Sequence, residues 1–184
     1  MKTRNLLHKV TLGILVSLCA TVTVQASERP AEGYIMTVYE DLAQGQAILV
    51  GSPGAVIDAL TATDSDRKLS FAEKVNLCVA YTKVKRIDDA TVACDAAMMA
   101  SHKEAQRIRR MTSKLYANPG DARDVVMLAL SNRGVLHALT GEQEKARELF
   151  EQALDLPSRR SDSQIRTSAA QNLARLGDKL ADNR

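Results

Sequence analysis

The stretch Leu130–Pro157 constrains the fold of this chain most strongly, because it has the pattern of two helices joined by a short turn. Its second half places apolar residues at i, i+3, i+4, i+7 and i+8, which is one face of an α-helix. These residues are Ala146, Leu149, Phe150, Ala153 and Leu154. Thr140-Gly141 supplies the turn, and Pro157 stops the second helix. The stretch therefore predicts an antiparallel helix hairpin.

Gly134 lies inside the first helix of this hairpin, where glycine costs about 1 kcal/mol relative to alanine. A residue without a Cβ lets a partner helix approach closely, which is a physical reason to find glycine there. Ala146, across the turn, is the residue that we expect to face it. The pair predicts tight packing of the two helices at this level.

The hairpin resembles the tetratricopeptide repeat, whose pattern has a small residue in helix A, a turn glycine, A-x3-F-x2-A and a terminal proline. The matching residues are Asn132, Gly134, Gly141, Ala146, Phe150, Ala153 and Pro157. His137 stands where the pattern usually has tyrosine, and Arg133 where it usually has leucine. The resemblance implies an all-α fold: a short right-handed α-solenoid of antiparallel helix hairpins with a C-terminal capping helix.

The same pattern divides the rest of the chain. We expect a single helical-repeat domain over residues 34–184. Its hairpins are predicted at about 35–62, 71–99 and 122–157, with a capping helix at about 161–177 that Gly177 ends. The hairpin at 71–99 matches at Asn76, Leu77 and Tyr81, although its turn has no glycine.

Two segments fit the repeat pattern poorly. Tyr34–Tyr39, YIMTVY, is β-branched and aromatic, but no second strand is evident to pair with it. We expect an extended lead-in, or the first turn of a helix that runs to about Val50. The residues from Ser101 to about Asp121 lengthen the spacing between two hairpins, and they are expected to form a loop or an extra helix on one face.

The N-terminal residues 1–26 have the features of a secretory signal peptide, with a basic start, a short apolar core and a small-x-small cleavage site. Residues 27–33 are then a flexible lead. Three of the 25 Lys and Arg, and none of the 22 Asp and Glu, lie in residues 1–26, so the mature chain has 22 of each and no formal net charge. The signal-like residues predict export to the periplasm or secretion, with no stable membrane span after cleavage. The neutral charge of the mature chain predicts no nucleic-acid surface.

Cys78 and Cys94 remain after cleavage and stand on opposite arms of the hairpin at 71–99. They are equally far from the turn, and both occupy positions that pack inward in the resembled repeat. An exported chain meets an oxidising compartment, and a bridge is feasible if the Cα atoms lie within about 7 Å. It would close a loop of about 15 residues and stabilise the fold by roughly 3 kcal/mol. The alternative is two free buried cysteines that act as small apolar residues.

The sequence predicts no catalytic, cofactor-binding or metal-binding residues, because it has none of the motifs that signal them. His137 is expected to be a half-buried core residue and His102 to be exposed. The basic run from Lys103 to Lys114 is interpreted as a solvated helix face, with an acidic partner or an anionic lipid surface as the alternative.

The resemblance implies that helices A face a shared concave side, where a groove takes peptides or protein segments. The candidate groove residues are Val75, Val79, Thr82, Ser131, Val135 and Ala138. They are small and weakly polar, which favours a hydrophobic or shape-based contact over carboxylate capture. We therefore expect a non-enzymatic interaction scaffold of the bacterial cell envelope for an unknown protein or peptide, without a cofactor. The alternatives are an enzyme or enzyme accessory with an unrecognised site, and a structural or stress-linked envelope protein.

Overall fold

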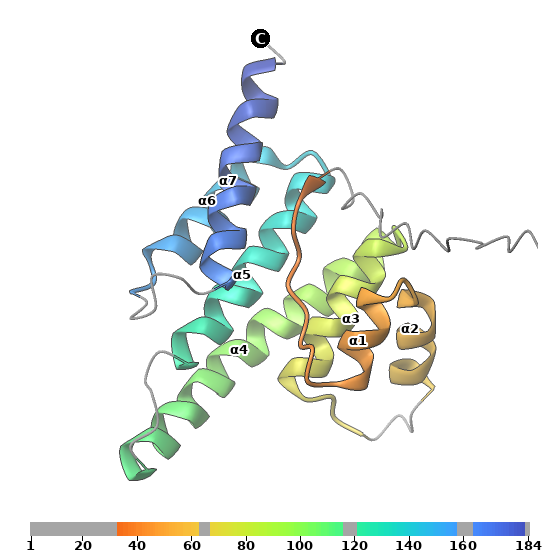
Figure 1. The fold of residues 1–184 in the computed structure, drawn as a ribbon, viewed down its shortest axis with the longest axis vertical. Coiled ribbons are helices and arrows are strands. Elements are labelled where there is room, and N and C mark those ends of the chain that lie inside the picture. The colour runs from red at the N-terminus through yellow and green to blue at the C-terminus, as the bar shows by residue number, and fades with distance from the viewer. Residues whose placement is uncertain (1–32, 63–66, 116–120, 158–163, 183–184) are drawn as a thin grey trace, which may run out of the picture.

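The computed structural model describes residues 33–62, 67–115, 121–157 and 164–182 (Figure 1). Within these ranges the chain is all-α, as predicted, with seven helices and no strand. The predicted signal peptide, residues 1–26, and the lead at 27–33, apart from Gly33, lie outside the described residues. None of the helices in the described ranges combines the length and the apolar character that a membrane span requires.

Each helix packs against the next one along the chain. The helices are α1 (Ala43–Leu49), α2 (Pro53–Thr61), α3 (Phe71–Lys83), α4 (Ile87–Leu115), α5 (Asp121–Leu139), α6 (Gln143–Asp155) and α7 (Gln164–Asp182). The odd-numbered helices also contact one another in series, α1 with α3, α3 with α5 and α5 with α7. These four helices therefore form a connected row, and the even-numbered helices alternate with them along the chain.

The turns that follow α1, α3 and α5 share one geometry. One residue in each has a positive φ: Gly51 at 85°, Lys85 at 60° and Gly141 at 82°. The next N–H then donates to the carbonyl five residues earlier, at 2.8, 3.0 and 2.9 Å, which closes the helix end and reverses the chain. The hairpin at 71–99 thus turns without glycine because Lys85 takes the left-handed conformation, which costs a non-glycine residue about 1 kcal/mol.

Three element boundaries differ from those expected. The first helix begins at Ala43, so the start of the predicted hairpin at 35–62 is not helical. Helix α4 runs to Leu115 instead of ending near residue 99, because Ala105 and Ile108 pack in one cluster with the first turns of α5. Gly177 does not end the capping helix, which continues to Asp182.

The atoms nearest to Gly134 across the hairpin belong to Phe150, one helical turn from Ala146, the residue expected to face it. A Cβ added to Gly134 would lie 2.6 Å from Cε1 of the Phe150 ring. The ring is fully buried, at 0 % exposure, so it has no free space to retreat into. The interior glycine therefore makes room for an aromatic ring between α5 and α6.

Candidate functional site

An extended segment, Tyr34–Tyr39, runs along the row of odd-numbered helices. Figure 1 shows it in orange, passing α7 and α5 before it reaches α1. Of the two structures expected for this run, the structure has the extended one. The missing partner strand is replaced by side chains from helices, because extended main chain still needs hydrogen-bond partners when it is buried.

Three asparagine side chains bind the main chain of this segment. In each case the asparagine Oδ1 accepts from an N–H of the segment, and its Nδ2 donates to the carbonyl of the same residue. The pairs are Asn172 with Ile35 at 2.7 and 2.7 Å, Asn132 with Thr37 at 2.9 and 2.8 Å, and Asn76 with Tyr39 at 2.8 and 3.3 Å. We call these three residues the asparagine row.

The asparagine row comes from three different helices, α7, α5 and α3. Its side chains are almost fully buried, at 1 %, 2 % and 0 % exposure in that order. A buried amide is costly unless its donor and its acceptor are both bonded. Each amide meets that need by binding one peptide unit on either side of a single residue. The row consequently bonds only main-chain groups, so the clamped residue needs a free N–H but no particular side chain.

The residues between the clamped ones point their side chains into the helices. Tyr34 and Val38 are buried, and Met36 is half-buried between their two clusters. Tyr34 packs in one cluster with Val135 and Phe150, and the Lys179 ammonium lies 4.9 Å from its ring centre. This alternation is the period-two pattern of an extended strand, and it ends at Tyr39, which is clamped and also packs edge-to-face on the Phe71 ring with the centroids 5.6 Å apart.

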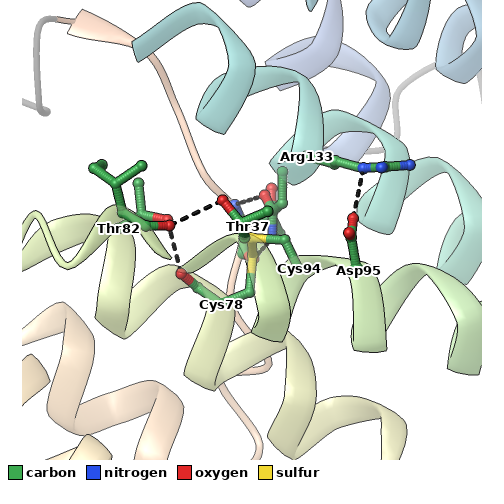
Figure 2. Close-up of a disulfide and its surroundings, with 9 residues drawn as sticks. Thr37, Cys78, Thr82, Cys94, Asp95 and Arg133 are labelled. Carbon is green, nitrogen blue, oxygen red and sulfur yellow. Dashed lines mark hydrogen bonds and ion pairs between the residues drawn. A yellow bond between two sulfur atoms is a disulfide. The ribbon is translucent and has the colours of Figure 1, made fainter. Parts of the chain in front are cut away.

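The six predicted groove residues lie on the helices that the segment crosses. Five are buried and Ala138 is half-buried. Their shared clusters place Val79 with Val38, Val75 with Tyr39, and Val135 and Ala138 with Tyr34. Thr82 points toward Thr37 in Figure 2. Ser131 is buried on α5, next to Asn132.

Sequence reasoning missed the asparagine row as binding residues. The repeat pattern predicts Asn76 and Asn132 only as helix A positions, and Asn172 lies in the predicted capping helix. The available signal was one asparagine in helix A of two hairpins and a third in the last helix, together with a strand-like run that had no partner. The run has main-chain groups that need partners, and the three asparagine side chains bond them.

Cys78 of α3 and Cys94 of α4 form a disulfide, with an S–S distance of 2.04 Å and a Cα–Cα distance of 4.7 Å (Figure 2). The predicted bridge is therefore present. Both residues are buried in the cluster that holds Val38. The Thr82 hydroxyl donates to the Cys78 carbonyl at 2.8 Å within α3, and the bridge itself holds α3 and α4 together beneath the extended segment.

The segment leaves part of the groove open. A cavity of about 800 Å³ lies beside Thr37–Asp41, walled by α4, α5 and α7. Its apolar wall residues are Ile108, Val125, Leu128 and Ile165, and its charged ones include Glu104, Arg107 and Asp124. Burial, helped by the carboxylates of Glu104 and Asp124, raises the pKa of Tyr39 well above its usual range. The Tyr39 phenol is therefore protonated at neutral pH.

The remaining residues that were considered as sites have ordinary surroundings. His137 is half-buried, and its Nδ1 lies 3.2 Å from a Glu142 oxygen. His102 is exposed. In the basic run, Arg107 forms an ion pair with Glu104 on an exposed turn of α4. Across the described part of the chain, no group of three or more His, Cys, Asp and Glu side chains is arranged to hold a metal ion.

Arg133, which stands where the repeat pattern has leucine, forms an ion pair with Asp95. Its Nε lies 2.9 Å from the Asp95 Oδ1, and the pair connects α5 with α4 (Figure 2). A half-exposed position allows an arginine there, because its stem packs while its charge remains near water.

Comparison of this chain with known protein families, with curated proteins and with solved structures found no match in any of the three.

Proposed function

We propose that this chain is a non-enzymatic protein-interaction scaffold that binds an extended peptide or protein segment in the groove along α3, α5 and α7. The observation that carries the proposal is the asparagine row. Each of its three amides uses its donor and its acceptor on the peptide main chain, and the three come from successive odd-numbered helices. A side-chain clamp on main chain is a means of holding an extended segment, and it performs no chemistry on it.

A tetratricopeptide-like architecture forms part of the proposal. It is supported by the contact series of the odd-numbered helices and by the shared turn geometry after α1, α3 and α5. The packing of Phe150 against Gly134 adds to this support, because both residues belong to the resembled repeat pattern. In such a stack the A helices line one side, which is where the groove lies.

We also propose that the protein acts in the bacterial cell envelope, in the periplasm or after secretion. The Cys78–Cys94 disulfide supports this location, because such bridges persist in oxidising compartments and are rare in the cytosol. The signal-like residues 1–26 support it from the sequence. Cell fractionation with mass spectrometry of the N-terminus tests it: an uncleaved protein in the cytosol contradicts the proposal.

The groove is tested by photo-crosslinking in the native cell. A photoreactive amino acid at Gln164, which lines the open cavity, is expected to crosslink a defined partner segment. The same amino acid at Glu151, exposed on α6, is the matched control and is expected not to do so. Asn132→Asp, which removes one donor of the clamp, is expected to weaken the Gln164 crosslink. Equal crosslinking from both positions, or none from either, contradicts a groove function.

A further inference from the structure

The occupant of the groove is a segment of this chain, and its pattern describes what the groove accepts. Main-chain N–H and C=O groups are bound at residues 35, 37 and 39. Between them, Tyr34, Met36 and Val38 enter the apolar clusters. A ligand in the same track needs an apolar or aromatic residue at each alternate position. It also needs a free N–H at the positions between them, which excludes proline there.

The segment completes no helix and no sheet. It is tied to α3, α5 and α7 by asparagine side chains and by its own buried side chains, and both kinds of contact re-form with any extended chain of the same pattern. Its own course then leaves the groove. A Cβ on Gly45 would lie 1.9 Å from the Tyr39 carbonyl oxygen, so the chain folds back tightly on itself after Tyr39 to begin α1.

The cavity of about 800 Å³ is therefore lined on one side by Thr37–Asp41 but is not filled by the segment. A separate peptide has no connection to α1 and does not need to turn back. It can place additional residues against Ile108, Leu128 and Ile165. Such a ligand makes the contacts of the segment and adds to those that Tyr39 already makes with this cluster. That difference allows it to compete with an occupant that is covalently attached.

We propose that Tyr34–Tyr39 is an exchangeable, autoinhibitory occupant of the groove. The partner is a protein segment that binds extended, with apolar or aromatic side chains at three alternate positions and non-proline residues between them. This inference rests on the function proposed above. The apparent affinity of the partner is reduced by the fraction of molecules whose groove is closed, so weakening the internal segment strengthens binding.

A labelled peptide of residues 32–41, EGYIMTVYED, tests the competition by fluorescence anisotropy with the mature full-length chain. The double variant Tyr34→Ala/Val38→Ala weakens the internal occupant and leaves the asparagine row intact. It is expected to bind the peptide at least 10-fold more tightly than the wild type. Equal binding by both proteins, or no binding by the folded double variant, overturns the inference.

Two control peptides test the recognition pattern. Thr37→Pro in the peptide removes the N–H that donates to Asn132 Oδ1. The altered peptide is expected to lose at least 10-fold in affinity. The peptide EGSISTSYED replaces the apolar side chains at the three alternate positions with serine, and it is expected to lose as much. Undiminished binding of either control overturns the inference. If these peptides fail while Gln164 still crosslinks a partner, the scaffold function stands and the exchange mechanism is refuted.

Hydrogen exchange tests the inference on the wild type alone, so it does not depend on whether a variant folds. The amides of Ile35, Thr37 and Tyr39 are expected to exchange at least 100-fold faster than the core amides of Val79 and Val135, since the segment opens without global unfolding. Exchange of the segment at the rate of the core shows that it is a permanent part of the fold and overturns the proposal.

Discussion

Single amide groups have large effects at the residue scale, because a buried polar atom that loses its partner also loses its contact with water. Asn172 illustrates this. Its amide bonds both the N–H and the C=O of Ile35, and only 1 % of the residue is exposed. Asn172 contributes little apolar area to the core, so its importance comes from hydrogen bonding.

Asn172→Ala is expected to destabilise the protein by about 2 kcal/mol, because it leaves the main-chain groups of Ile35 without these bonds. Urea unfolding measures the change. Gln171→Ala is the matched control, since Gln171 is an exposed amide on the same helix, and its effect is expected to stay within about 0.5 kcal/mol. Equal losses in the two variants contradict the clamp.

Two helical glycines give a second comparison at this scale. Gly134→Ala places a Cβ 2.6 Å from Cε1 of the buried Phe150 ring, and the cost of overpacking exceeds the helix propensity gained. We expect a net loss of about 1–2 kcal/mol. Gly177→Ala meets nothing within 4 Å in α7 and is expected to gain about 0.5–1 kcal/mol. Thermal unfolding of both variants checks the opposite signs.

At the scale of elements, helix ends determine where the hairpins begin and turn. Helix α3 starts with a capping box in which the Ser70 N–H donates to Glu73 at 2.8 Å and the Glu73 N–H donates to Ser70 Oγ at 3.3 Å. Burial by itself raises the pKa of Glu73, but hydrogen bonds from Ser70 and the adjacent Arg67 guanidinium outweigh it and lower the pKa below its usual range.

A lowered pKa in the folded state makes the Glu73 contribution depend on pH in a definite direction. The contribution is present above the unfolded value of about 4.5 and is lost as the pH falls through the folded value. Glu73→Gln retains an acceptor for Ser70 and removes the charge. We expect the wild type to be more stable by about 0.5–1 kcal/mol at pH 7, and the difference to shrink as the pH falls from about 4.5 towards 3. Melting temperatures of both proteins between these pH values test this; a constant difference contradicts it.

At the scale of the whole molecule, the disulfide and the extended segment link elements that the helix pattern leaves independent. The bridge joins α3 and α4 through two residues that are 16 positions apart in the sequence, under the track of the segment. Loss of this closure increases the entropy of the unfolded chain. Reduction is therefore expected to affect both stability and the order of the groove.

Reductant is expected to lower the free energy of unfolding of the wild type by about 3 kcal/mol. The double variant Cys78→Ala/Cys94→Ala is expected to lose part of this free energy without reductant and to show no further change with it. The variant thus separates loss of the bridge from other effects of the reagent. Urea titrations with and without reductant give the comparison. A wild type that does not respond contradicts a stabilising role for the bridge.

The sequence by itself determined what depends on local pattern. Apolar residues at helical spacing predicted the helices of the hairpin at Leu130–Pro157, because the 3.6-residue period fixes which side chains share a face. The bridge was predicted from the symmetry of Cys78 and Cys94 about a turn, together with their inward positions in the resembled repeat and the expected export.

Only the tertiary structure decided what holds the extended segment Tyr34–Tyr39. Asn76, Asn132 and Asn172 are far apart along the chain, and nothing local indicates that their amides converge on Tyr34–Tyr39. The continuation of α4 past residue 99 likewise depends on the packing of Ala105 and Ile108 against α5. Local pattern sets helix faces, but hydrogen bonds between distant segments form only where packing brings their partners together.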